Sequence, residues 1–440
     1  MIVGNIHMII SRELKAGAHP GDLLALLEEL SPVEKAGVLE RLSGSETALI
    51  FQEMEDYEQA ELLRLLSENK ARQLFRGLAS DDAADLIGEL TVDEAREMLT
   101  SIGLDESLDL SDLLKYPEES AGGIMTTGYT SLPADIPVEE AIGRLREIAP
   151  EAETIYYVYV VDDAGRLSGV LSLRDLIVSA EGTLIKDVMR TNVISVNADL
   201  DQEEVARVVS KYDLLAVPVV DSEKRLLGII TVDDVIDVLE QEATEDIYRL
   251  AGAGEIEGVE LTEAKVNKIV RMRLPWLLIS MIGGVISGSV IGVYENTLEA
   301  IVMLAVFIPV IMDMGGNVGT QSSTIYVRGL ATGEIEKERE WAYFSREVQI
   351  GAVMGAFCGV LIAIIALLWQ GNPYLGLVVG ISMFSTISIA AILGTVVPMA
   401  CNKLKIDPAI TAGPFVTTLK DVTGLLIYFM IASAFLEYLR

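Results

Sequence analysis

One carboxylate, Asp421, lies inside an apolar stretch that covers residues 409–436. A carboxylate in mid-membrane costs roughly 2.5 to 3.5 kcal/mol even on a lenient insertion scale, so Asp421 needs a partner. Lys420 is adjacent, but neighbouring residues on a helix point about 100° apart, and the pair therefore does not share a face. Thr417 and Gly413 precede Asp421 at spacings of four and do share its face. Asp421 is thus the leading candidate ligand for a cation, with Thr417 and Gly413 on the same side of the helix.

A second apolar stretch, residues 300–327, carries polar groups that a lipid-facing helix does not need. We expect Pro309 and the glycine-rich run after it to break this helix, which is tolerated only where protein or a water-filled cavity satisfies the backbone. The alternative is a tightly packed helix crossing, because small residues let helices approach closely. Packing alone does not call for Asp313, Asn317 and Gln321 together, so we favour a pore lining that includes Asn317.

The residues available as ligands restrict the kind of metal. His7 and His19 are the only histidines, and Cys358 and Cys401, the only cysteines, both lie in apolar runs. A site for a softer transition metal is therefore not expected. Mg2+ prefers oxygen ligands and keeps much of its water, which fits one carboxylate surrounded by hydroxyls and carbonyls. Chemistry alone does not exclude Ca2+, Mn2+ or Co2+.

The elements that must position these side chains are membrane spans. Hydrophobic residues make up 51% of the 440-residue chain, which is high for a soluble protein. A span needs about 20 apolar residues. Five spans are predicted, the third and fourth being divided by the polar residues 370–373. They lie within residues 274–294, 300–327, 348–402 (two spans) and 409–436.

The loops between the spans give the orientation. Basic residues precede the first span, separate the second from the third, and separate the fourth from the fifth: Lys265, Lys268, Arg271, Arg273, Arg328, Lys337, Arg339, Arg346, Lys403 and Lys405. The loops around Glu295 and Asn372 contain no Lys or Arg. By the positive-inside rule, the N-terminal part is cytoplasmic, and the C-terminus lies outside the cell membrane.

The charge is divided unevenly along the chain. Residues 1–264 hold 55 of the 66 acidic and 21 of the 33 basic residues, which leaves −34 in this part and +1 in the rest. Such an acidic half would repel nucleic acid and attract cations. We expect no nucleic-acid partner.

Two repeats organise the acidic half. Between Leu23 and Ile102 a cap residue, one or two acids and apolar residues at helical spacing recur, which predicts a solenoid of short helices starting at Ser31, Ser43, Asp56, Ser67, Ser80 and Thr91. Ser31 with Glu34 and Thr91 with Glu94 fit capping boxes. The simplest role for such a solenoid is protein interaction or spacing.

In the second repeat, residues 160–175 reappear as residues 219–234. Each copy reads as a strand, a turn, a second strand and a capped helix that begins near Ser172 or Thr231. This pattern resembles a tandem CBS pair. The resemblance implies a regulatory module, and many such modules bind adenine nucleotides.

The whole arrangement resembles the MgtE family of magnesium transporters and channels. The matching motifs are Pro309 with residues 315–321, and residues 407–409 with Gly413–Pro414 and residues 417–424. The resemblance implies a homodimer with its pore at the subunit interface and a filter formed by Asp421 and the Thr417 carbonyl. The predicted fold is a multidomain membrane protein: an all-α solenoid (1–120), an α/β tandem CBS pair (121–246), a connecting helix that plugs the pore (247–273) and a transmembrane domain of five helices (274–440).

The resemblance also implies regulatory sites. Acids that match those at the family's domain boundaries, where intracellular Mg2+ binds, are Asp81, Asp85, Glu203, Asp213, Asp234, Asp237, Glu242, Glu245 and Asp246. Bound Mg2+ would draw the repelling domains together and close the pore. ATP or another adenine nucleotide at Tyr157, Arg174 and Asp175 would tune this response.

The prediction is therefore channel-like Mg2+ uptake that intracellular Mg2+ regulates. The chain lacks a phosphate loop ending in Gly-Lys-Ser/Thr and a His-Glu-x-x-His helix, so no enzyme is expected. A CBS-regulated secondary transporter or efflux protein for another divalent cation is the main alternative. A membrane-tethered nucleotide sensor is another, but it leaves Asp421 unexplained.

Overall fold

The computed structural model describes residues 2–439 except 29, 55, 89, 91–93, 96–97, 99–109, 111–112, 149–151, 153, 253–265, 336–338, 405 and 410–412. The chain forms two compact units, Met1–Glu240 and Gln241–Arg440.

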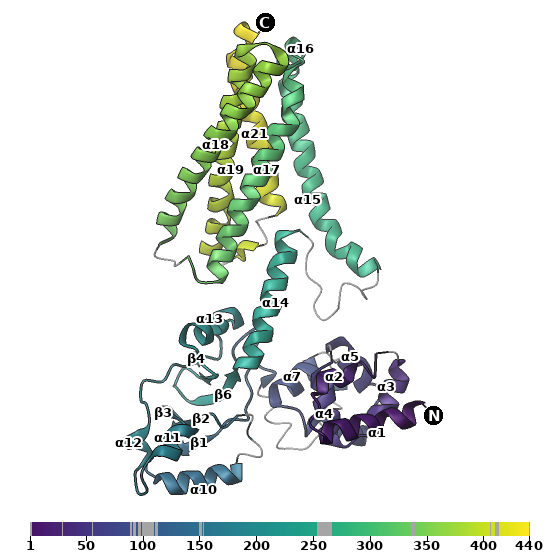
Figure 1. The fold of residues 1–440 in the computed structure, drawn as a ribbon, viewed down its shortest axis with the longest axis vertical. Coiled ribbons are helices and arrows are strands. Elements are labelled where there is room, and N and C mark those ends of the chain that lie inside the picture. Colours follow the sequence, from purple (N-terminus) through teal and green to yellow (C-terminus); the bar gives the residue numbers. More distant parts are fainter. Residues whose placement is uncertain are drawn as a thin grey trace. The chain divides into compact units, whose positions relative to one another are not determined.

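The first unit begins with a stack of short helices (Figure 1). They are α1 (Ile2–Lys15), α2 (Pro20–Leu24), α3 (Pro32–Leu39), α4 (Gly44–Gln52), α5 (Asp56–Leu63), α6 (Glu68–Phe75) and α7 (Ser80–Gly88). Helices two apart in sequence pack on each other: α1 on α3, α2 on α4, α3 on α5, α4 on α6 and α5 on α7. This stacking confirms the predicted helical solenoid.

Caps start these helices where the sequence predicts. The Ser31 N–H donates to the Glu34 carboxylate at 3.1 Å, and Ser43 makes the same reciprocal box with Glu46. Ser67 caps α6 through the Lys70 N–H. The predicted start at Thr91 lies outside the described residues.

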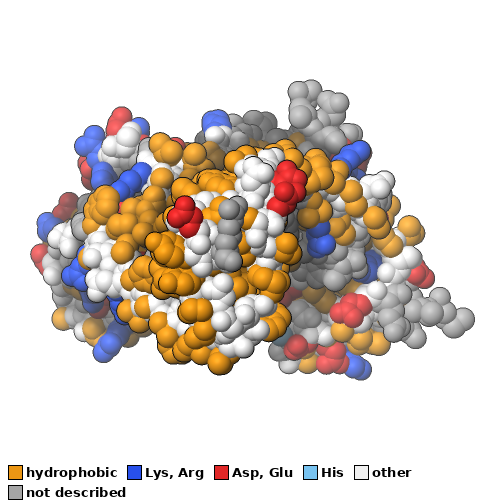
Figure 2. All heavy atoms as spheres, turned by 90° about the horizontal axis from the view of Figure 1, so that it is seen from above, with side chains coloured by type: hydrophobic (Ala, Val, Ile, Leu, Met, Phe, Trp, Pro, Cys, Tyr) orange, Lys and Arg blue, Asp and Glu red, His pale blue; other side chains and the backbone are white. Residues whose placement is uncertain are grey.

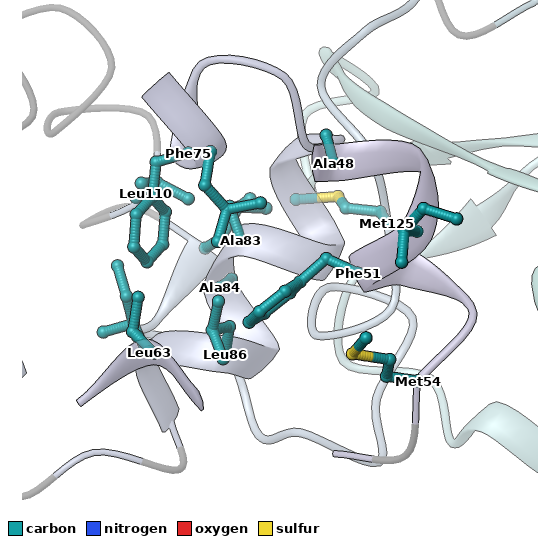
Figure 3. Packing of buried hydrophobic residues seen from close by; sticks show 14 of the residues in the cluster. Ala48, Phe51, Met54, Leu63, Phe75, Ala83, Ala84, Leu86, Leu110 and Met125 are labelled. Atoms are coloured by element: carbon teal, nitrogen blue, oxygen red, sulfur yellow. The ribbon is translucent and has the colours of Figure 1, made fainter. Parts of the chain in front are cut away.

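Buried apolar side chains hold the stack together and continue beyond it. Phe51, Ala84 and Leu86 lie together in the core, and Met125, which follows the stack in sequence, belongs to the same cluster (Figure 3). The cluster extends to Val217 and Val235 of the repeat that comes next. The helical stack and the second repeat therefore share one core, which fixes α7 against that repeat.

The repeat is built from two copies of one small sheet. The first copy comprises β1 (Ser131–Pro133), α10 (Val138–Ile148), β2 (Tyr157–Val161), β3 (Leu167–Ser172) and α11 (Leu173–Val178). The second comprises α12 (Ile185–Val188), β4 (Val196–Asn197), α13 (Gln202–Tyr212), β5 (Ala216–Val220), β6 (Leu226–Thr231) and α14 (Val232–Leu250). The orders are β1-β2-β3 and β4-β5-β6, each with one parallel and one antiparallel pair.

The two copies agree in detail. Each has its register shift at the equivalent place, between Val160 and Val161 and between Val219 and Val220. Helices α11 and α14 begin directly after Ser172 and Thr231, the two predicted caps. The predicted tandem arrangement is confirmed.

The second unit contains the membrane helices. They are α15 (Val266–Val293), α16 (Glu295–Ala300), α17 (Leu304–Ala331), α18 (Glu340–Gln370), α19 (Pro373–Lys403), α21 (Pro414–Ala434) and α22 (Leu436–Leu439). Helices α15, α18, α19 and residues 415–434 of α21 are long and apolar enough to cross a membrane. Helix α17 is also 28 residues long but carries the polar groups noted above. Helices α17, α18, α19 and α21 form a bundle, with α15 beside α21 (Figure 1).

The prediction that Pro309 breaks the second span is wrong. Helix α17 is continuous from Leu304 to Ala331, through Pro309 and the glycines after it. A proline removes only one backbone hydrogen bond, and neighbouring helices can support the remainder. The glycines serve close packing: a Cβ on Gly315 would lie 2.8 Å from the Thr386 methyl, and one on Gly394 would lie 2.4 Å from the Gly319 carbonyl.

The end of the bundle that carries the C-terminus is mostly hydrophobic, with few acidic side chains in the middle of the view (Figure 2).

The turns at Glu295 and Asn372, which the sequence leaves without basic residues, are helix boundaries here. Asn372 caps α19 by accepting hydrogen bonds from the N–H groups of Tyr374 and Leu375.

Candidate ion pathway and regulatory sites

Helix α21 presents the predicted ion ligand. The Asp421 side chain is half-buried, and no described residue donates it a hydrogen bond. One turn earlier, Thr417 is exposed, and its hydroxyl donates to the Gly413 carbonyl at 3.0 Å. Gly413 is the N-cap of α21. The three predicted residues thus follow one another along one helix, and the carboxylate is available to a cation.

Helix α17 presents an exposed polar stripe: Asp313, Asn317, Thr320 and Gln321. The Asn317 amide donates to the Asp313 carboxylate at 3.2 Å, which fixes both groups one turn apart. A polar stripe on a membrane helix requires water or another protein surface beside it. The stripe that contains the predicted pore residue Asn317 therefore needs water or another protein surface beside it.

Lys420 connects these two helices. Its side chain is 5% exposed, and its ammonium donates to the Gly316 carbonyl at 2.7 Å. Lys420 thus points from α21 to α17, away from the face of Asp421, as the helical geometry predicts. Its partner was not predicted from the sequence, although two glycines three apart were a signal for a close approach.

Two further buried carboxylates tie α17 to α18 and were also missed. Ser322 donates to Glu347 at 2.7 Å, and Tyr326 donates to Glu340 at 3.3 Å. Both glutamates are less than a tenth exposed. Their hydrogen bonds satisfy groups that would otherwise be costly to bury, so they hold the bundle in register.

The last turn of α14 belongs to the membrane unit. Arg249 forms ion pairs with Glu245 on its own helix and with Asp407 in the connection between α19 and α21. Leu250 packs with Val327 and Ala409. A Cβ on Gly413 would lie 3.2 Å from the Leu250 carbonyl, so glycine there permits this contact. The end of α14 therefore touches the start of α21, two turns before Asp421.

Acidic side chains converge where α7 meets α14 in the first unit. Burial raises the pKa of Asp234 to about 6, although hydrogen bonds from Thr231 oppose the shift, and the charges of Asp233 and Asp82 add to it. The pKa of Asp237 is also raised, first by burial and then by acids that include Asp82. The two helices thus bring like charges together, which a divalent cation would neutralise. Asp81 and Asp85 lie on α7 beside Asp82, Asp81 being almost fully buried.

The remaining predicted regulatory acids are separated. Glu203 and Asp213 are ten residues apart along α13, which is about 15 Å on a helix, too far to share one ion. Burial raises the pKa of Glu203 despite its ion pair with Arg207. Glu242, Glu245 and Asp246 lie in the second unit. Within the described parts of the chain, no three acidic, histidine or cysteine side chains gather closely enough to hold a metal.

A cavity of about 310 Å3 lies between the two sheet copies, and the predicted nucleotide residues surround it in part. Tyr157 and Asp175 line this cavity, whereas Arg174 lines an adjacent one of about 480 Å3 that also includes Tyr157. Asp175 accepts hydrogen bonds from the N–H and hydroxyl of Ser172, which lower its pKa and hold it ionised. Arg190, which the sequence did not single out, also lines the first cavity.

Three family models match the chain in sequence order. Residues 18–119 match the MgtE intracellular N domain, residues 121–182 and 185–241 match the CBS domain, and residues 308–431 match a divalent cation transporter domain. The magnesium transporter MgtE of Bacillus subtilis is 44% identical over 328 residues, which are 74% of this chain and 72% of that protein. The chain belongs to the MgtE family.

Two further comparisons agree. The MgtE of Thermus thermophilus is 44% identical over 330 residues, 75% of this chain and 73% of that protein. A crystal structure of the cytosolic domain of the Mg2+ channel MgtE with ATP matches 52% of this chain and 93% of that one, at 42% identity and a TM-score of 0.50. The predicted MgtE architecture, with helical N domain, CBS pair and membrane helices, is confirmed.

Proposed function

We propose that this MgtE-family chain takes up Mg2+ across the cell membrane through a channel-like pore. The observation that supports it most is the Asp421 carboxylate, which lies on a membrane helix without a hydrogen-bond donor among the described residues. The relatives of this chain in Bacillus subtilis and Thermus thermophilus are magnesium transporters. A single carboxylate beside hydroxyls and carbonyls suits an ion that keeps part of its water.

The pore would form between two copies of the chain. The α17 stripe and Thr417 are exposed in a single copy. Only 6% of the most apolar 18-residue stretch of α15 is buried there. A second copy would cover these surfaces and enclose the stripe as an aqueous path. The filter would then consist of the Asp421 carboxylates and Thr417 carbonyls of both copies, with Gly413 and Asn317 nearby.

Regulation would come from the acidic half, which lies in the cytoplasm with the C-terminus outside. Mg2+ bound between α7 and α14 would relieve the repulsion around Asp234 and Asp237. The other acids, Asp81, Asp85, Glu203, Asp213, Glu242, Glu245 and Asp246, would contribute further sites that form between domains or copies. The segment 247–273 would then hold the pore closed from the Gly413 end.

An adenine nucleotide would bind in the cavities lined by Tyr157, Arg174 and Asp175. The crystal structure of the related cytosolic domain holds ATP. The ionised Asp175 carboxylate can accept hydrogen bonds from the hydroxyls of a nucleotide, while a neighbouring arginine pairs with its phosphates. Nucleotide binding would adjust how the sensor responds to Mg2+.

The test is Mg2+ uptake by the purified full-length chain in liposomes. We expect saturable uptake that persists when proton and sodium gradients are abolished. Uptake that requires either gradient would instead support the secondary transporter. Absence of Mg2+ uptake in a correctly folded preparation would overturn the proposal.

A further inference from the structure

The groove between α17 and α21 holds the stem of Lys420. A Cβ built on Gly319 would lie 3.1 Å from the lysine Cδ, and one on Gly316 would lie 3.4 Å from its Nζ. Glycine at both positions therefore leaves space for the lysine side chain to cross α17. The hydrogen bond to the Gly316 carbonyl then fixes the ammonium against α17.

Two carboxylates influence the fixed ammonium. Asp421 and Asp313 both act on it electrostatically, one from its own helix and one from α17. Neither forms an ion pair with it within the described residues, and the ammonium instead donates to the neutral Gly316 carbonyl. The lysine therefore reduces the negative potential at both acids without occupying either as a ligand.

We propose that Lys420 is a tethered cation that keeps the affinity of the Asp421 site for Mg2+ low enough for rapid release. Conduction requires a site that is favourable to enter and weak enough to leave. An ion held by unopposed carboxylates would stay longer, because charge interactions strengthen where water is scarce. This inference rests on the proposed function, and it assigns an affinity-tuning role to a residue that does not touch the ion.

The competing explanation is that Lys420 only clamps α17 to α21. A clamp depends on the hydrogen bond and on the volume of the side chain, whereas a tuning charge depends on the ammonium. Three variants separate these properties. Lys420→Arg keeps the charge, Lys420→Gln keeps a donor without charge, and Lys420→Met keeps the stem alone.

The experiment measures the initial rate of Mg2+ uptake against Mg2+ concentration for the full-length protein and the three variants in liposomes. We expect Lys420→Gln and Lys420→Met to lower the half-saturating Mg2+ concentration by roughly three- to tenfold and to lower the maximal rate. Lys420→Arg should retain the half-saturating concentration of the original protein. Thermal unfolding of each variant is followed in parallel.

An unchanged half-saturating concentration in Lys420→Gln, with or without a loss of thermal stability, would overturn the charge role. Lys420→Gln decides the question even where Lys420→Met fails to fold, because its amide keeps a hydrogen-bond donor on the side chain without the charge. If the unaltered protein takes up no Mg2+, the proposed function fails, and this inference fails with it. If the unaltered protein transports and only the charge effect is missing, this inference alone is wrong.

Discussion

Arg249, in the last turn of α14, forms an ion pair with Asp407, which precedes α21 by seven residues. The two residues are 158 positions apart, and the pair fastens the end of α14 to the connection that leads into α21. Because the side chains are about 28% exposed, the ion pair is only partly screened by solvent. A movement of α14 can therefore be transmitted to α21 through this contact.

Replacing Arg249 by Ala should weaken inhibition by internal Mg2+. The closed arrangement would lose both the pair with Asp407 and the packing of the arginine stem, whereas the filter helix would keep its own contacts. The measurement is Mg2+ efflux from liposomes at several internal concentrations. Arg144→Ala, which removes an exposed ion pair with Glu140 on α10, is the matched control. Full inhibition in Arg249→Ala would exclude this contact from gating.

The contribution of Asp234 to the stability of the first unit should fall as the pH rises from about 4 to about 6. Asp234 has a pKa of about 6 in the folded chain against an ordinary value of 3.8, so the folded state binds more protons in this range. The protonated Asp234 therefore stabilises the fold below pH 3.8, its ordinary pKa. This stabilisation, roughly 3 kcal/mol at most, is lost as the pH rises through the pKa of the folded chain. The free energy of unfolding of Asp234→Asn should therefore depend less on pH than that of the unaltered chain.

The measurement for Asp234 is denaturant unfolding without Mg2+ at pH 4.5 and pH 7. Asp163→Asn, in an exposed turn, is the control and should leave the pH dependence unchanged. An equal loss of stability with pH in Asp234→Asn and in the unaltered protein would show that other groups cause it.

Millimolar Mg2+ should protect residues 242–258 from protease and reduce uptake, and K+ at matched ionic strength should not. Bridging of opposed acids needs a divalent ion, whereas screening does not. Neutralising Asp234, Asp237, Glu242 and Asp246 together should weaken both responses in parallel. Equal protection by K+, or full Mg2+ inhibition in the quadruple variant, would contradict metal-bridged gating at these acids.

The sequence predicts much of the fold because its signals are local. The caps at Ser31 and Ser172 and the apolar lengths of α18 and α19 depend on neighbouring residues, and the structure confirms them. The continuity of α17 through Pro309 was mispredicted, since support from neighbouring helices outweighs the one lost hydrogen bond.

The site is predicted less completely because its contacts are distant in sequence. Asp421, Thr417 and Gly413 follow from helical spacing within one segment. The partner of Lys420 is 104 residues away, and that of Arg249 is 158 residues away, so only tertiary packing brings them together. The regulatory acids came from resemblance, and the structure divides them between its two units.

The most direct test of the account is Mg2+ uptake by Asp421→Ala in liposomes, beside Glu437→Ala as a control that removes an exposed acid from α22. Crosslinking and size-exclusion chromatography would establish that both variants assemble as the unaltered chain does. The account predicts that Asp421→Ala assembles normally but loses Mg2+ uptake, and that Glu437→Ala keeps it. Near-normal Mg2+ uptake by Asp421→Ala would contradict the assignment of this carboxylate as the ion ligand of the pore.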